Sequence, residues 1–231
     1  MIVIKQLRVD VLGEPLFEKV NLVIPTGERV GVLGARASDV TAFLRVVADE
    51  DEMDDGTVTR DGERVGYVSP EVLEGGADAL ACVLRARPTF LIIDTHDTSS
   101  SVDQQALQRF IAQFRGGMLI ASENADVMHV ARVTRILEID PATRSISSFT
   151  GNYAAYLVER EKAQARIAEA YEKQQREKRR LENWLEEKRL EATKDRAPEK
   201  GATIRTKAKY LQREILDKEI PKPFHLEPGE K

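Results

Sequence analysis

The segment from Gly34 to Thr41 contains the residue types of a phosphate-binding loop in altered form, reading GARASDVT. In such a loop, glycines let backbone N–H groups close around phosphates, a lysine reaches the β- and γ-phosphates, and a hydroxyl binds Mg²⁺. Gly34 and Thr41 match the first glycine and the hydroxyl, but Ala37 and Asp39 stand where later glycines belong, and Val40 replaces the lysine. The segment therefore predicts a phosphate site that has lost its cation and gained a carboxylate.

A structural explanation is also open for these residues. Glycine is common where a strand turns into a helix, and a threonine hydroxyl is common near a helix N-terminus. The apolar run at residues 90–94 (FLIID) is typical of a buried strand, and Asp94 at its end could simply cap the segment that follows.

A cluster of cations lies between residues 188 and 209, where eight basic residues stand against three carboxylates, a net charge of +5. Such a cluster gains affinity for nucleic acid by displacing counterions from phosphates, and it does so without reading sequence. The alternative is a solvated helix surface whose charges pair with one another. The candidate RNA-binding residues are Lys188, Arg189, Lys194, Arg196, Lys200, Arg205, Lys207 and Lys209.

Other chemistries are disfavoured by composition. One cysteine in 231 residues, Cys82, excludes a disulfide framework and a multi-cysteine metal site, and we expect it to be a buried core thiol. His96, His129 and His225 lack ligand spacing, so we expect no metal site. No apolar run approaches the roughly 20 residues of a membrane span, and the first residues have no signal-peptide pattern. A cytoplasmic protein without membrane contact is expected.

The elements that must position these residues fall into two regions. Residues 1–150 carry a net charge of −8 (15 Lys and Arg against 23 Asp and Glu), and residues 151–231 carry +4 (20 against 16). In the first region strands alternate with helices, which predicts an α/β fold with a mostly parallel sheet. Strands are expected at residues 2–9, 19–24, 29–33, 90–94, 118–122 and 135–139, a hairpin at 57–59 and 64–68, and helices at 40–48, 77–87, 102–113 and 127–133.

The second region has helical composition. Residues 153–196 lack Gly and Pro, which predicts a helix about 65 Å long at 1.5 Å per residue. Pro198 and Gly201 then break it, and a second helix is expected to follow, giving an antiparallel helical hairpin. We refer to residues 151–220 as the arm, and we expect residues 221–231 to be a tail.

The order of these segments resembles the ABC-F family, the soluble, translation-associated branch of the ATP-binding cassette proteins. The similarity is carried by residues 26–34 (TGERVGVLG), 90–94 (FLIID) and 133–140 (VTRILEID), and above all by 151–157 (GNYAAYL) before a charged helix. In the family that last segment joins the first cassette to the interdomain arm. The resemblance implies a reduced P-loop NTPase core, residues 1–150, followed by this arm.

The resemblance also implies roles for individual residues. Gly34, Thr41 and Asp94 correspond to nucleotide-binding positions, with Asp94 as the Walker B aspartate. Thr95 replaces the glutamate that polarises the attacking water, and Glu123 replaces the switch histidine. The signature-like segment 73–76 (LEGG) follows the Q-loop position so closely that the family's helical subdomain is expected to be missing. The chain also ends where a second cassette would begin, so two composite ATP sites are not expected in one molecule.

From the resemblance we expect a non-catalytic, ribosome-associated protein that acts on translation by presenting its basic arm to rRNA or tRNA. No cofactor is expected, although weak Mg-ATP binding stays open. One alternative is an interaction subunit that pairs with an intact ABC-F protein and modulates it. Another is a residual ATP-binding translation ATPase.

Overall fold

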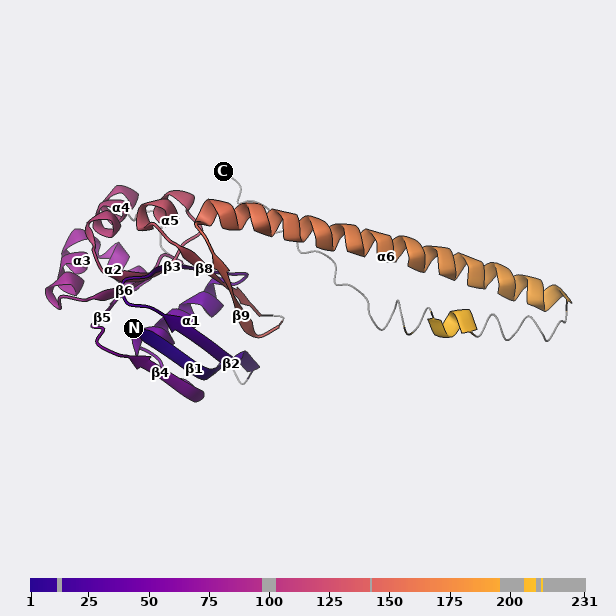
Figure 1. Ribbon diagram of the computed structural model, residues 1–231, viewed down its shortest axis with the longest axis horizontal. Coiled ribbons are helices and arrows are strands. Elements are labelled where there is room, and N and C mark those ends of the chain that lie inside the picture. Colours follow the sequence, from indigo (N-terminus) through magenta and orange to yellow (C-terminus); the bar gives the residue numbers. More distant parts are fainter. Residues whose placement is uncertain (12–13, 97–102, 142, 196–205, 211–212, 214–231) are drawn as a thin grey trace. The chain divides into compact units, whose positions relative to one another are not determined.

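The computed structural model describes residues 1–11, 14–96, 103–141, 143–195, 206–210 and 213. Its larger sheet has six strands in the order β5-β6-β7-β3-β8-β9 (Figure 1). The first five are parallel and β9 is antiparallel to β8, which confirms the predicted α/β class. The strands are β5 (Val65–Val68), β6 (Phe90–Asp94), β7 (Gly117–Ala121), β3 (Arg29–Gly34), β8 (Arg135–Asp140) and β9 (Ser145–Thr150).

A second, antiparallel sheet has the order β2-β1-β4. It consists of β1 (Ile2–Val11), β2 (Glu14–Ile24) and β4 (Asp55–Arg60). The predicted hairpin of residues 57–59 with 64–68 is wrong. β4 pairs with β1, with Thr59 opposite Val3, whereas β5 pairs with β6 in the larger sheet. The turn at Gly62 exists, with φ at +72°, but it passes the chain from one sheet to the other.

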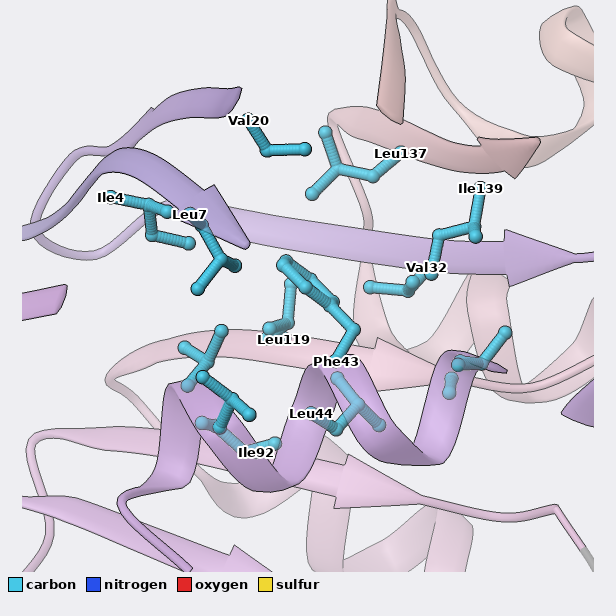
Figure 2. Close-up of a cluster of buried hydrophobic side chains, with 14 of the residues drawn as sticks. Ile4, Leu7, Val20, Val32, Phe43, Leu44, Ile92, Leu119, Leu137 and Ile139 are labelled. Carbon is cyan, nitrogen blue, oxygen red and sulfur yellow. The ribbon is translucent and has the colours of Figure 1, made fainter. Parts of the chain in front are cut away.

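The helix α1 (Ala37–Ala48) lies between the two sheets and fills the main core. Its Phe43 and Leu44 meet Ile4 and Leu7 from the antiparallel sheet and Ile92 from the parallel sheet (Figure 2). Burial of this many apolar side chains on one short helix anchors α1, and with it the loop that precedes it. The start of α1 is therefore a fixed position beside the ends of β3 and β6.

The other face of the parallel sheet is covered by α4 (Gln104–Gln113) and α5 (Ala125–Ala131), with Leu107 and Met128 in a second core. Between β5 and β6 the chain forms two short helices, α2 (Pro70–Glu74) and α3 (Gly76–Arg85). The expectation of a buried Cys82 is wrong, because the thiol is exposed. α3 turns Leu80 inward, and residue 82 is about 200° around the helix from it at 100° per residue.

The chain divides into two compact units, Met1–Leu157, which we call the body, and Val158–Lys231. The long helix α6 (Tyr153–Asp195) begins in the body, where Asn152 Oδ1 accepts a hydrogen bond from the N–H of Ala155 and Tyr156 is buried. The domain boundary predicted after residue 150 stays a prediction, and the expected tail, residues 221–231, lies outside the described residues. No described helix is both long and apolar enough to cross a membrane.

In the second unit, residues 206–210 are helical and run back along α6. The Lys207 ammonium lies 4.0 Å from the ring centroid of Trp184, and the Tyr210 hydroxyl donates to Glu177 Oε1 at 3.4 Å. Later residues of the segment thus meet earlier residues of α6, so the two run antiparallel there. Ala208 packs with Leu185 in a small apolar cluster.

Candidate functional site

The candidate site lies at the carboxyl ends of β3 and β6, where α1 begins. β3 ends at Gly34 and α1 already begins at Ala37, so the helix starts within the segment that would form a phosphate loop. The backbone N–H groups of Asp39 and Val40 both donate to the carbonyl of Arg36, at 3.2 and 3.4 Å. In a phosphate loop, N–H groups at this place point at the ligand. Here they close the first helical turn.

Val40, at the lysine position, is fully buried in the main core. Its Cγ2 would lie 2.8 Å from a Cβ placed on Gly34, and Ile139 Cβ would lie at 3.3 Å. Gly34 therefore has a packing role, because any side chain there would collide with Val40. The side chain that would have carried the binding charge is an apolar core residue instead.

The structure brings Thr41 and Asp94 into direct contact. The Thr41 hydroxyl donates to Asp94 Oδ2 at 2.6 Å. The backbone N–H of His96 donates to Asp94 Oδ1 at 3.0 Å, and His96 Nδ1 lies 3.1 Å from the same oxygen. Burial of Asp94 by itself would raise its pKa, but the hydrogen bonds from His96 and Thr41 outweigh burial and hold the pKa below its ordinary value. Both carboxylate oxygens are thus occupied by the protein's own groups.

A second buried carboxylate, Asp39, stands in the first turn of α1. Its Oδ2 accepts from Arg36 Nε at 2.8 Å, and its Oδ1 accepts from the Ser38 hydroxyl at 3.3 Å. The amino end of a helix favours negative charge, which is why phosphates bind there. In this protein the Asp39 carboxylate supplies that charge, and an incoming phosphate would meet it at close range.

Beside this arrangement is a cavity of about 380 Å³. Among the described residues that line it, none is Lys or Arg; they are Ala37, Thr95, His96, Gln104, Leu107, Ser122, Glu123, Asn124 and Val127. Thr95 donates its hydroxyl to the carbonyl of Ala121 at 2.9 Å, so that side chain is engaged. Glu123 contributes a carboxylate at the switch-histidine position. The described part of the cavity wall therefore has no lysine or arginine to neutralise phosphate.

We call Gly34, Asp39, Val40, Thr41, Asp94 and His96 together the α1 site. The sequence identified Gly34, Thr41 and Asp94, and the structure places all three at the start of α1. It missed His96 as the partner of Asp94, and Arg36 as the partner of Asp39. The Asp-x-His spacing was an available signal, because an aspartate at the start of a turn often accepts the N–H two residues later.

Comparisons with known proteins show what this chain is similar to. Residues 139–215 match the family model ABC_tran_Xtn, which is described as ABC transporter. The ribosome protection protein VmlR of Bacillus subtilis (strain 168) is 22% identical over 256 residues, covering 89% of this chain and 46% of that protein. The ATP-binding cassette MJ0796, solved as a dimer in a post-hydrolysis state bound to ADP and Pi, superposes with a TM-score of 0.50. This chain is an ABC-F-like protein.

The cassette structure covers 65% of the ABC-F-like chain and 98% of its own, at 14% identity, so it supports the fold alone. The ABC-F-like chain spans less than half the length of VmlR.

The predicted RNA-binding residues of the ABC-F-like arm are only partly described. Lys188 is half-buried on α6, one helical turn after Trp184, while Lys207 and Lys209 are exposed. Lys207 and Lys188 thus both belong to the surroundings of Trp184. Arg189 and Lys194 lie within α6, and their side chains are outside the described set, as are Arg196, Lys200 and Arg205 entirely.

Proposed function

We propose that this ABC-F-like protein binds the ribosome without turning over ATP and acts on translation through the cations of its arm. We propose the ribosome as the partner because VmlR, a ribosome protection protein, is similar to most of this chain. The absence of turnover is proposed from the α1 site. Both parts are open to separate tests.

The observation that carries the non-catalytic part is the burial of Val40 beside a fully occupied Asp94. Phosphoryl transfer depends almost entirely on positioning and charge neutralisation of the phosphates. For Mg-ATP to bind here, Asp94 would have to release Thr41 or His96, and Asp39 would have to leave the helix terminus. The position of the phosphate-binding lysine is taken by Val40, which is buried in the core, so no lysine at that position can offset either change.

The arm part is supported by the net positive charge of the predicted tip and by the contact of Lys207 with Trp184. A cation over an indole ring keeps its full charge while losing side-chain freedom, so Lys207 is held in place for a phosphate contact. Contacts of this type would anchor the arm on RNA in a salt-dependent way.

The test is ribosome pelleting across a salt series, with and without ATP. We expect salt-sensitive pelleting that ATP does not change. The variant R196Q/R205Q/K207Q/K209Q should reduce the slope of log affinity against log salt by about 3, at roughly 0.7 per lost phosphate contact. The control K162Q/R166Q/K173Q/R176Q removes the same charge from exposed positions earlier on α6 and should change the slope less. Wild-type protein that fails to pellet would overturn the proposal.

A second candidate function is an interaction subunit that pairs with an intact ABC-F protein. It is suggested by the similar cassette structure, which was solved as a dimer. Co-purification with an intact cassette protein, without ribosome pelleting, would select this function over the first. Calorimetric titration with Mg-ATP tests the alternative of a residual ATP-binding ATPase. Micromolar binding would contradict the proposal that the protein is non-catalytic.

A further inference from the structure

Arginine stands at the amino end of every strand of the parallel set. Parallel strands place their amino ends at one edge of the sheet, so residues at these positions form a row in the order of the strands. In the order β5, β6, β7, β3 and β8, the residues that open the strands or precede them by at most three positions include Arg64, Arg87, Arg115, Arg29 and Arg132. We call these five residues the arginine edge.

Hydrogen bonds gather three of these residues at one point. Arg29 donates from Nη1 to the carbonyl of Ala131 at 3.0 Å, and from Nη2 to the carbonyl of Phe114. Those two residues immediately precede Arg132 and Arg115, so the three arginines converge where α4 and α5 end. Burial, and then the nearby charges of Arg132 and Arg115, lower the pKa of Arg29, as expected for cations brought close together.

The other two arginines are linked in a similar way. Arg64 donates from Nε to the carbonyl of Arg87 at 2.9 Å, which joins the amino ends of β5 and β6. The side chains of Arg64, Arg87, Arg115 and Arg132 are all exposed, and Arg29 is half-buried behind them. The row therefore presents cations to solvent across five neighbouring strands, a distance of about 19 Å at ~4.8 Å per strand.

The carboxylates at this edge are engaged elsewhere. Glu28 Oε2 lies 2.7 Å from Arg135 Nη2, which is a separate ion pair. Glu63 accepts from the Thr89 hydroxyl at 2.6 Å and pairs with the amine of Met1 at 2.9 Å, and its side chain is only 3% exposed. Within the described part of the chain, no ion pair joins a member of the arginine edge to a carboxylate.

The helices that precede the strands explain part of the choice of arginine. Arg87 and Arg132 adopt left-handed conformations, with φ of 48° and 54°, where glycine or asparagine is favoured. Arg87, Arg115 and Arg132 come one or two residues after α3, α4 and α5 end, where the helix dipole favours a cation. The same positions place these exposed cations beside the amino ends of the strands.

The two ends of the parallel strands differ in charge. Carboxylates gather at the carboxyl edge, where Asp94, Glu123 and Asp140 lie at or just after strand ends. The exposed arginines of the amino edge make a local site of positive charge that attracts anions. Guanidinium groups suit phosphate particularly well, because they donate two parallel hydrogen bonds to its oxygens.

We propose that the arginine edge binds the phosphodiester backbone of RNA, as a second contact surface distinct from the arm. This assignment rests on the proposed function for its choice of RNA over other polyanions. The contact is independent of base sequence, because only phosphates are engaged. It would orient the body on RNA that the arm has already reached.

The test measures binding of the full chain to a fluorescein-labelled poly(U) oligonucleotide by anisotropy across a salt series. The variant R87Q/R115Q/R132Q leaves Arg29 and the arm unchanged, and should lower the salt slope by about 2. The control K5Q/K19Q/R109Q removes the same charge from exposed positions elsewhere on the body and should leave the slope nearly unchanged. R87K/R115K/R132K should keep the slope but weaken binding, because lysine cannot donate bidentately. Thermal melts establish that each variant folds.

The proposal would be overturned if R87Q/R115Q/R132Q and the wild type showed the same salt slope for poly(U) binding. It would also be overturned if the control K5Q/K19Q/R109Q lowered that slope as much as R87Q/R115Q/R132Q does. Equal competition by poly-glutamate, or tighter binding to phosphatidylserine vesicles than to poly(U), would overturn the assignment to RNA. Ribosome pelleting separates this inference from the proposed function. If wild-type protein pellets with ribosomes while R87Q/R115Q/R132Q keeps the wild-type salt slope for poly(U), the proposal for the arginine edge is wrong and the proposed function stands. If poly(U) binding depends on the arginine edge but the protein does not pellet with ribosomes, the arginine edge stands and the proposed function is wrong.

Discussion

The Thr41 hydroxyl donates a 2.6 Å hydrogen bond to Asp94 Oδ2, which ties the first turns of α1 to the end of β6. The same pair of residue types holds Mg²⁺ in a phosphate-binding site, through the hydroxyl and the strand-end carboxylate. In this protein the two side chains satisfy each other, and His96 takes the remaining carboxylate oxygen. The bond is thus a source of stability for the body, and this can be measured.

We predict that Asp94 makes the body more stable above its ordinary pKa of 3.8 than below it. The pKa is depressed in the folded protein, so the unfolded chain binds the proton more tightly. The contribution is therefore complete above pH 3.8 and is lost as the pH falls through the lower, folded value. Urea unfolding of wild type and Asp94→Asn at several pH values measures it. The variant should lack this part of the acid dependence, whereas exposed Asp78→Asn should retain it.

Val40→Lys should destabilise the body and should not restore nucleotide binding. Position 40 is fully buried among apolar side chains, so a lysine there leaves an unpaired charge, at a cost of about 3–5 kcal/mol. Urea unfolding and Mg-ATP calorimetry on the same sample give both readouts. Val40→Ile serves as the control for volume alone. A stable Val40→Lys protein with micromolar ATP affinity would show that the lysine position still faces a site.

Gly34→Ala should cost about 1–3 kcal/mol of folding free energy, as overpacking usually does. The added Cβ would lie 2.8 Å from Val40 Cγ2, and 3.3 Å from Ile139 Cβ. The double variant Gly34→Ala/Val40→Ala should recover part of the loss, beyond what the single variants predict by addition. Strict additivity in this double-mutant cycle would mean that Gly34 and Val40 do not contact each other.

The contact between Lys207 and Trp184 gives a prediction for the arm. Trp184 is the chain's one tryptophan, so its fluorescence reports on this place alone. Lys207→Gln should change the emission intensity and lower the stability of the returning segment by about 0.5–1 kcal/mol. Lys162→Gln, elsewhere on α6, should leave the emission unchanged. An unaltered spectrum in Lys207→Gln would contradict the contact.

The parts of the fold that the sequence predicted are those with strong local signals. The buried strands β6 and β7 are continuous apolar runs, and both were placed within a residue of their observed bounds. The partner of β4 was not predictable, because alternation specifies a strand without saying which strand lies beside it. β9 was missed because its sequence, SISSFT, is mostly polar and exposed, with only Ile146 and Phe149 turned inward.

The candidate site shows the same division. Gly34, Thr41 and Asp94 were found because their types and order follow a known motif, and the structure adds what each of them touches. The partner Arg36 depends on a side-chain direction that is set only when the first turn of α1 forms. His96 lies two residues after Asp94, and the Asp-x-His spacing could have indicated it. The packing reason for Gly34 likewise depends on the position of Val40. The sequence spacing of the two residues does not show that they lie close together across the turn.

The Asp39 carboxylate at the start of α1 has a consequence for any redesign of this protein. On the proposed function, building ATP use into this body would require removal of that charge, a lysine in place of Val40 and a glutamate in place of Thr95. A lysine introduced alone enters the core, and a glutamate introduced alone adds a charge beside two others. The three positions would therefore have to be changed together, and engineering that alters one of them at a time is expected to fail.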